Sequence, residues 1–343
     1  MGVPLDLAAL ARGIRDARGL AHKRDIDAVV ARLGLGRRDA RVPLGDDCAA
    51  IPDGDGHLLL AIEGFLDGFV AANPYFAGYC GVMVNVGDIA AMGGRPIAVV
   101  DALWSRDADA ADPVLRGLRD AAARYGVPVV GGHTNSRAGS ANLAVAILGR
   151  AGPRLLTSFD ARPGDDLLAA IDLRGRFREP DPYWDASTGA PAERLRGDLA
   201  LLAGLAEDGL ARAAKDVSMA GIVGTALMLL ECSGVGAAID PAAIPRPEGV
   251  PLARWLTAFP SFGYLVSVRP DRTGAVLARF RERGIDAARI GGIDAGRIAR
   301  IRDPDAAGGG SEAVVWDFAA GPLIGCGRPG HAAAGAPGGE AGA

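Results

Sequence analysis

Acidic and glycine-rich residues occur in four separate segments that could act together on a bound phosphate. Gly45-Asp46-Asp47 follows an expected strand, Asn85 and Asp88 lie in an apolar stretch, and Asp216 with Ser218 begins an expected helix. The fourth segment, Gly131-Gly132-His133-Thr134, directly follows another expected strand. Oxygen ligands from several loops suit Mg²⁺, which is held through carboxylates and substrate phosphates together. The segments therefore indicate phosphate chemistry in which magnesium withdraws charge from a transferring phosphoryl group.

Alternative interpretations of single segments stay open. Asp46-Asp47 is compatible with a plain turn, because Gly-Asp is turn chemistry. Gly131 and Gly132 would let backbone amides approach phosphate oxygens, whereas His133 beside them fits either a phosphate contact or a structural hydrogen bond. Neither a Walker A run G-x-x-x-x-G-K-[ST] nor a kinase-type G-x-G-x-x-G occurs in the sequence, so the common ATP cradles are absent.

The stretch from Tyr79 to Pro96 is predicted to be the central helix and the turn that ends it. Its residues are apolar on nearly every side, which is typical of a buried helix. Asn85 and Asp88 stand one turn apart and point the same way. Burying Asp88 without a partner costs several kcal/mol, so a positive group should meet it. The alternative is a structural role, in which this carboxylate binds a nearby backbone amide or an arginine.

Length and composition exclude several classes of protein. The 343 residues allow two domains, and apolar and charged contents of 49% and 23% are ordinary for a globular chain. A net charge of -4 gives no general attraction for nucleic acid or an anionic membrane. Four cysteines far apart in the sequence indicate neither a zinc site nor a disulfide framework. With no signal pattern and no long apolar run, we expect a cytoplasmic enzyme or binding protein.

Strands and helices alternate along the chain, which predicts an α/β fold. Residues 1–150 form one expected domain and residues 151–326 a second, while the Gly/Ala/Pro-rich tail over residues 327–343 is expected to be disordered. A strand that runs into a turn with two carboxylates is expected within residues 41–50. Further strands are expected over residues 57–62, 97–103, 127–130, 142–148, 166–171, 237–240, 262–268 and 290–293. Helices are expected over residues 5–33, 79–92, 112–125, 192–208, 216–233 and 274–283.

Taken together and in this order, the motifs resemble one family. The run Asn85-Val-Gly-Asp88-Ile-Ala-Ala-Met-Gly-Gly-Arg-Pro96 resembles the N-x-S-D-x-A-A-M-G-x-x-P helix of the aminoimidazole ribonucleotide (AIR) synthetase superfamily. Gly45-Asp46-Asp47-Cys-Ala-Ala50 resembles its GDDAA turn, and Asp216-Val-Ser218-Met-Ala-Gly221 resembles the thiamine-phosphate kinase pattern. The Gly131 to Thr134 run is more similar to selenophosphate synthetase. The resemblance covers about residues 40–300.

This resemblance implies a PurM-like, two-domain fold of mixed α/β sheets. The N-terminal domain would dimerise through its sheet, making a homodimer, and ATP with Mg²⁺ would lie in the cleft beside a small-molecule substrate. Asp46, Asp88 and Asp216 would be the metal carboxylates and catalytic residues, with Glu63 serving the same metals. Asp47, Asn85 and Ser218 would support the metals and cofactor. Gly131, Gly132, His133 and Thr134 would line the nucleotide phosphates.

Departures from the family pattern leave several functions open. Met219 stands where thiamine-phosphate kinases have a second Asp, and His133 replaces another. The leading hypothesis is an ATP- and Mg²⁺-dependent phosphotransferase, most like a thiamine-monophosphate-kinase-type small-molecule kinase. The alternatives are a selenophosphate-synthetase-like or AIR-synthetase-like synthetase, or a nucleotide-binding maturation protein without turnover. The N-terminal stretch has Lys23 but no cysteine, which argues against selenium activation.

Overall fold

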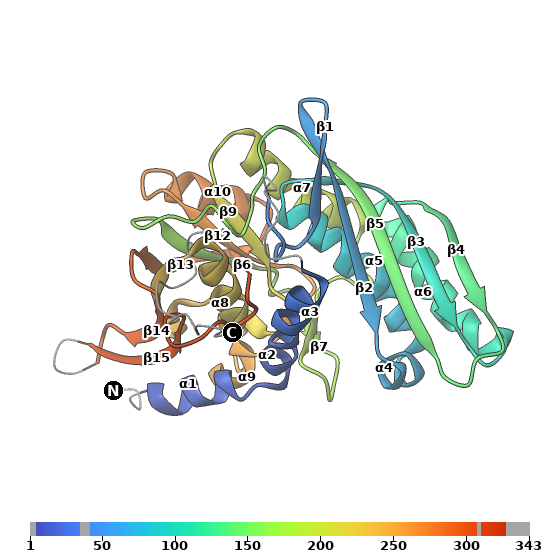
Figure 1. Ribbon diagram of the computed structural model, residues 1–343, viewed down its shortest axis with the longest axis horizontal. Helices are drawn as coiled ribbons and strands as arrows, with labels where there is room; N and C mark the ends of the chain where they lie inside the picture. The colour runs from blue at the N-terminus through green and yellow to red at the C-terminus, as the bar shows by residue number, and fades with distance from the viewer. Residues whose placement is uncertain (1–4, 35–41, 307–309, 327–343) are drawn as a thin grey trace, which may run out of the picture.

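The computed structural model describes residues 5–34, 42–306 and 310–326. Two large mixed sheets lie next to each other, and helices pack against each of them (Figure 1). The expected mixed α/β fold is thus confirmed. Within the described ranges, no helix combines the length and the apolar character that a membrane span requires.

The first sheet has five strands in the order β1-β2-β5-β3-β4. Only the β3–β4 pair is parallel among its neighbours, and the other three pairs are antiparallel. The strands are β1 (Ala49–Asp53), β2 (Gly56–Phe65), β3 (Arg95–Trp104), β4 (Val129–Asn135) and β5 (Asn142–Ala151).

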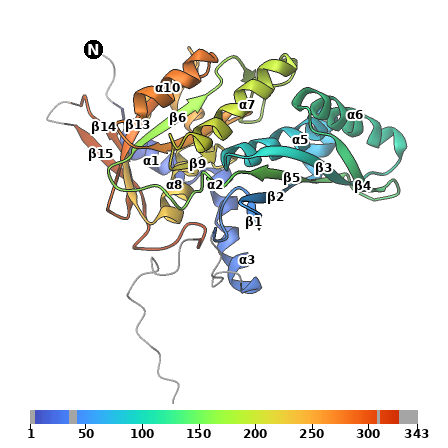
Figure 2. The same cartoon turned by 90° about the horizontal axis from the view of Figure 1, so that it is seen from above.

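Two long helices, α5 (Pro74–Ala91) and α6 (Ala108–Tyr125), cover one face of this sheet, while no helix of the described residues covers its other face, which we call the bare face (Figure 2). Helix α5 is apolar all round because it is enclosed between the sheet and α6, and it carries the core of this half. Pro74 begins the helix, where a missing N–H costs nothing. Gly93, at φ 74°, then takes the left-handed conformation that turns the chain into β3. A short helix, α4 (Asp67–Ala72), connects β2 to α5.

The second sheet has seven strands in the order β15-β14-β10-β13-β6-β12-β9. Side chains alternate between its faces, so Leu167 and Ala169 join one core and Leu168 and Ala170 join the other. Helices α1 and α8 pack on the first of these faces, and α7 and α10 on the second. The strands are β6 (Asp166–Ile171), β9 (Ala213–Asp216), β10 (Gly236–Ile239), β12 (Gly263–Val268), β13 (Asp286–Asp294), β14 (Ile298–Asp303) and β15 (Ser311–Asp317).

The remaining elements surround the second sheet and border the first. The helices are α1 (Leu7–Arg15), α2 (Arg18–Lys23), α3 (Asp25–Leu33), α7 (Ala192–Glu207), α8 (Gly221–Ser233), α9 (Leu252–Leu256) and α10 (Thr273–Glu282), with a 3-10 turn at Pro241–Ala243. A small sheet in the order β11-β8-β7 is built from β7 (Arg176–Phe177), β8 (Tyr183–Asp185) and β11 (Phe259–Pro260). Its position beside α4 and α5 matters for the site, because β8 contributes to the same cavity.

Most expected elements are present, but three expectations need correction. The segment expected within residues 41–50 as a strand and a turn has no strand over residues 42–48, and β1 begins only at Ala49. Gly131 to Thr134 do not form a loop after a strand, because they lie inside β4. Strands β14 and β15 were not foreseen. The domain boundaries remain a prediction, and the tail over residues 327–343 lies outside the described residues.

Candidate functional site

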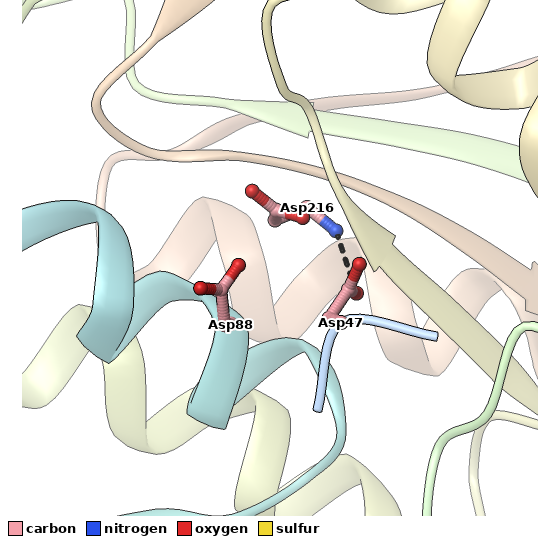
Figure 3. Close-up of side chains that lie close together, drawn as sticks. All are labelled: Asp47, Asp88 and Asp216. Carbon is pink, nitrogen blue, oxygen red and sulfur yellow. Dashed lines mark hydrogen bonds between the residues drawn. The ribbon is translucent and has the colours of Figure 1, made fainter. Parts of the chain in front are cut away.

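Three aspartates from distant parts of the chain meet between the two sheets. Asp47, Asp88 and Asp216 each offer a carboxylate oxygen, and the three oxygens lie within 4.8 Å of one another (Figure 3). Asp47 comes from the irregular segment before β1, Asp88 from the last turn of α5, and Asp216 from the end of β9. Three clustered carboxylates repel one another, so this arrangement requires a positive group nearby.

Asp88 has an unsatisfied buried oxygen. The residue is 6% exposed, and its Oδ2 atom has no hydrogen-bond partner among the described residues. Burial raises the pKa of the Asp88 carboxyl well above its usual range, and the charges of Asp216 and Glu63 raise it further. An orphaned carboxylate oxygen of this kind fits a divalent cation, because a bound ion would replace the water that burial has removed.

Asp47 is held by a buried lysine. The Nζ atom of Lys215 donates to Asp47 Oδ1, and the backbone N–H of Asp216 donates to Asp47 Oδ2 at 3.4 Å. Burial disfavours the ammonium, yet the neighbouring carboxylates, Asp47 first, raise the Lys215 pKa above its ordinary value. Lys215 is therefore a permanent cation inside the carboxylate cluster.

Asp216 and Ser218 come from the turn that connects β9 to α8. Burial, followed by the charge of Asp47, raises the pKa of Asp216 well above its ordinary value. The Ser218 backbone N–H donates to Thr225 Oγ1 at 3.2 Å, which fixes the turn, while Ser218 Oγ is buried without a partner. The Asp216–Ser218 turn thus presents two oxygen groups that a ligand could use.

Asp46 occupies a different place from the one expected. Its carboxylate accepts hydrogen bonds from Ser158 N at 2.9 Å and from Ser158 Oγ at 2.7 Å, so it ties the segment before β1 to the second half of the chain. Burial, followed by the charge of Asp47, raises the pKa of Asp46 to about 6. In this structure Asp47, and not Asp46, completes the group with Asp88 and Asp216.

A cavity of about 680 Å³ opens beside the three aspartates. At its polar end Glu63, Lys23 and His22 accompany the carboxylates, and Met219 lies at the rim. Lys23 projects from α2, and Gly19 one turn earlier allows this helix to lie against the Met219 backbone: a Cβ there would stand 1.7 Å from Met219 O. The other end of the cavity is lined mainly by aromatic and aliphatic side chains.

Two predicted segments do not reach this cavity in the single chain. Asn85 is fully buried, and its amide donates to Gly81 O at 2.8 Å and Val145 O at 3.0 Å, so it joins α5 to β5. The Gly131 to Thr134 run lies on β4, the edge strand of the first sheet, and is exposed. Neither segment belongs to the cavity lining.

Sequence reasoning missed Lys215 and the aromatic end of the cavity. Lys215 could have been found, since it directly precedes Asp216 and buried carboxylates require a cation. The aromatic residues gave no such signal, because they come from separate segments and each reads as an ordinary core residue.

Two family models match the chain on either side of this site. The AIR synthase related protein N-terminal domain matches residues 45–151, and the AIR synthase related protein C-terminal domain matches residues 186–303. The first range contains the five-stranded sheet with Asp47 and Asp88, and the second contains Asp216. The fold and the two matches together define a PurM-like, two-domain protein. The chain belongs to the AIR synthase-related superfamily, as the resemblance of its motifs implied.

Full-length relatives of the chain are known from bacteria and archaea. It is 47% identical over 317 residues to the uncharacterized protein sll0787 of Synechocystis sp., covering 91% of this chain and 96% of that protein. It is 34% identical over 329 residues to the uncharacterized protein MJ0640 of Methanocaldococcus jannaschii, covering 94% and 100%. Phosphoribosylformylglycinamidine synthase subunit PurL of Bradyrhizobium sp. is 28% identical over 320 residues, but the chain spans only 41% of it.

Solved structures show the same fold. T. maritima PurL complexed with AMPPCP matches with a TM-score of 0.71 at 19% identity, covering 94% of this chain and 52% of that one. AaThiL complexed with AMPPCP and TMP matches with a TM-score of 0.61 at 20% identity, covering 80% of this chain and 91% of that one. At these identities the likeness concerns the fold alone.

Proposed function

We propose that this protein is an ATP- and Mg²⁺-dependent enzyme that transfers a phosphoryl group to a small molecule or activates it through phosphate. The observation that carries the proposal is the meeting of Asp47, Asp88 and Asp216 within 4.8 Å at one end of a large cavity. The buried, unpartnered oxygen of Asp88 supports it independently. Solved relatives of the same fold are described as complexes with ATP, ADP or AMPPCP, which is compatible with a nucleotide here.

Each residue of the polar end has a proposed role. Asp88 and Asp216 would hold Mg²⁺ as the catalytic carboxylates, with Asp47 as third ligand and Glu63 and Ser218 at the margin. Asp46 would position Asp47 through the segment that Ser158 anchors. Lys215 would keep Asp47 oriented and offer positive charge to a phosphate. Bound magnesium would withdraw charge from the transferring phosphoryl group.

Among phosphate-dependent enzymes, we favour a small-molecule kinase of the thiamine-monophosphate-kinase type. The chain covers 91% of AaThiL but about half of the PurL chains, so the described fold corresponds to nearly the whole of that protein and to only part of PurL. A selenophosphate-synthetase-like or AIR-synthetase-like synthetase is the alternative within this class. The absence of a cysteine from the stretch around Lys23 disfavours the selenium reaction.

Binding of the nucleotide is the first test of the proposal. Isothermal titration calorimetry with Mg–AMPPCP should show one tight site in the wild type and at least a tenfold loss in Asp88→Asn, because the substitution removes a charged ligand. Asp55→Asn, in an exposed turn of the same half, is the matched control and should bind as the wild type does. Equal affinity in Asp88→Asn and the wild type would overturn the proposal.

A nucleotide-binding protein without turnover is a second candidate. The observation that favours it is Met219, which is 39% exposed at the cavity and supplies no carboxylate where the kinase pattern has one. An ADP-release assay with ATP alone and with candidate acceptors separates the two candidates. Binding of Mg–AMPPCP without any release of ADP from ATP would favour this second function.

We also propose that the protein is a cytoplasmic homodimer that pairs through the bare face of the first sheet. Large apolar side chains are exposed there, including Leu60, Ile62 and Val130. Such a contiguous apolar face marks an interaction surface. Four free cysteines, all buried, are compatible with a reducing compartment. Neither nucleic acid nor membrane is a proposed partner, in keeping with the net charge of -4.

A further inference from the structure

Five aromatic rings form one connected group at the apolar end of the cavity. We call Phe65, Phe69, Phe76, Tyr183 and Phe259 the aromatic wall, and all five line the cavity. Tyr183 packs edge-on against Phe69 with ring centroids 5.4 Å apart and against Phe259 at 6.1 Å, while Phe69 contacts Phe76 and Phe65 at 6.2 Å each. Both halves of the chain contribute to the aromatic wall. Phe65 ends β2, Phe69 lies in α4 and Phe76 lies in the first turn of α5, whereas Tyr183 and Phe259 come from β8 and β11.

The aromatic wall begins close to the carboxylates. Glu63 and Phe65 alternate with Ile62 and Gly64 along β2, so both point to the cavity, with their Cα atoms about 7 Å apart. On α5, Val84 lies one turn before Asp88, and both also line the cavity. A ring against the wall would therefore lie a few bonds from a phosphate held at the aspartates. Adenine does not fit this spacing well, because three phosphates and a ribose separate it from the transferred group.

One pair of opposite charges at this end is neutralised within the protein. Arg178 donates to Asp185 Oδ2 from both Nε at 2.9 Å and Nη2 at 2.6 Å, and its guanidinium stacks on Phe76 at 4.4 Å. Asp185 Oδ1 accepts from the backbone N–H groups of Ser187 and Thr188. Among the described residues of the lining, this end thus offers ring faces and aliphatic groups but no free cation for a charged substituent.

Building on the proposed function, we infer that the acceptor is a planar, uncharged ring compound whose reacting oxygen or nitrogen is attached within a few bonds of the ring. The ring stacks against the aromatic wall, and the reacting atom faces the aspartate end. Ring faces prefer offset or edge-on contacts with other aromatic rings, which a saturated ring of the same size does not offer.

Two small probes test this inference. Saturation-transfer NMR with benzyl alcohol and with cyclohexylmethanol, each in the presence of Mg–AMPPCP, should show stronger binding of the aromatic probe. Phe76→Leu and Phe69→Leu should each weaken benzyl alcohol binding roughly threefold to tenfold, the loss expected for one aromatic pair. Phe318→Leu is the matched control, because Phe318 and Phe76 are both 6% exposed but Phe318 lies outside the cavity lining. Phe69 is less buried than Phe76, so its variant keeps the test valid if Phe76→Leu misfolds.

The outcomes separate this inference from the proposed function. Equal binding of the two probes, or unchanged benzyl alcohol binding in both leucine variants, would overturn the ring acceptor while Mg–AMPPCP binding still supports the function. Displacement of benzyl alcohol by Mg–AMPPCP, together with weaker nucleotide binding in Phe69→Leu, would show that the aromatic wall binds adenine. This result would also overturn the inferred ring acceptor. Failure of the wild type to bind Mg–AMPPCP would instead overturn the proposed function itself.

Discussion

At the scale of single residues, the polar end of the cavity stores unfavourable electrostatic energy. Asp88 and Asp216 are buried and their pKa values are raised by burial, while Lys215 is hydrogen-bonded to Asp47 and to neither of them. Such a site gives up folding stability in exchange for affinity, because the same groups that repel one another attract a divalent cation.

Asp88→Asn should therefore have opposite effects on stability and on binding. At pH 7 and without metal, the variant should be more stable than the wild type by about 1–3 kcal/mol, since it removes a buried carboxyl group that has an unpartnered oxygen and must either take up a proton or stay charged beside Asp216 and Glu63. Chemical denaturation in the presence of EDTA measures this difference. Added Mg–AMPPCP should raise the melting temperature of the wild type by more than that of Asp88→Asn, because the variant binds it at least tenfold more weakly. A less stable variant under these conditions would show that Asp88 has a structural partner.

Asp46 should make metal-free stability depend on pH between about 4 and 6. Its pKa is raised from an ordinary 3.8 to about 6, so the folded protein binds its proton more tightly than the unfolded chain does. This contribution to stability is complete below pH 4 and is lost as the pH rises through 6, with a slope of up to about 1.4 kcal/mol per pH unit. The free energy of unfolding, measured by chemical denaturation at several pH values in this range, should change less with pH in Asp46→Asn than in the wild type. An equal slope in both proteins would contradict the assignment.

The sequence predicted most of these residues but not their partners. The apolar residues around Asp88 are enough to place it on a buried helix, whereas the convergence of Asp216 on Asp88 was an expectation that the family resemblance supplied. Asp46 and Asp47 are adjacent and chemically identical, so only the fold shows which one faces the cluster and which one binds Ser158. The contact of Asn85 with Val145 O on β5 could not be read from the sequence for the same reason, since the two residues are sixty positions apart.

At the scale of elements, α5 and α6 are held in unusually close contact by glycines. A Cβ on Gly78 would lie 2.0 Å from Val114 O, and one on Gly117 would lie 2.0 Å from Tyr75 O. Each glycine thus receives the backbone of the opposite helix. This contact holds α5 in place and with it Asp88 at the end of the helix.

Gly78→Ala should destabilise the protein by about 1–3 kcal/mol, because the new methyl group meets backbone that cannot rotate away. Gly68→Ala on α4 is the control: a Cβ there meets nothing within 4 Å, and alanine is the better helix former, so stability should be equal or higher. Urea denaturation of both variants checks the pair. Equal stability of Gly78→Ala and the wild type would mean that the helices separate readily.

Hydrophobic periodicity predicted whether a segment is a helix or a strand, but it did not predict the residues at which each element ends. The long helices and buried strands carry strong patterns, and they occur where expected. Strand β4 continues through Gly131 and Gly132 only because β3 offers it a parallel partner, with Val100 opposite Gly131. From the local sequence alone, two consecutive glycines predict the end of a strand. Pairing with β3 overrides this local preference.

At the scale of the whole molecule, the two sheets differ in how they are covered. The second sheet has helices on both faces, whereas the first has helices on one face and apolar side chains exposed on the other (Figure 2). In the proposed homodimer, a second copy of the chain would cover that second face through the same surface.

Ile62→Asp should convert the proposed dimer into a monomer. Ile62 is 69% exposed on the bare face, and a carboxylate there would have to be desolvated in the interface. Light scattering coupled to size-exclusion chromatography measures the mass in solution. Val314→Asp on β15, where the valine is 49% exposed, is the control and should keep the wild-type mass. A monomeric wild type, or a dimeric Ile62→Asp, would refute pairing through this face.

The ammonium of Lys215 has a consequence for how the protein folds before any metal is bound. Because a built-in positive charge already sits against Asp47, the chain carries its own counter-ion before any metal arrives. Under the proposed function, folding would therefore not have to wait for magnesium, and the ion would bind afterwards together with the nucleotide phosphates.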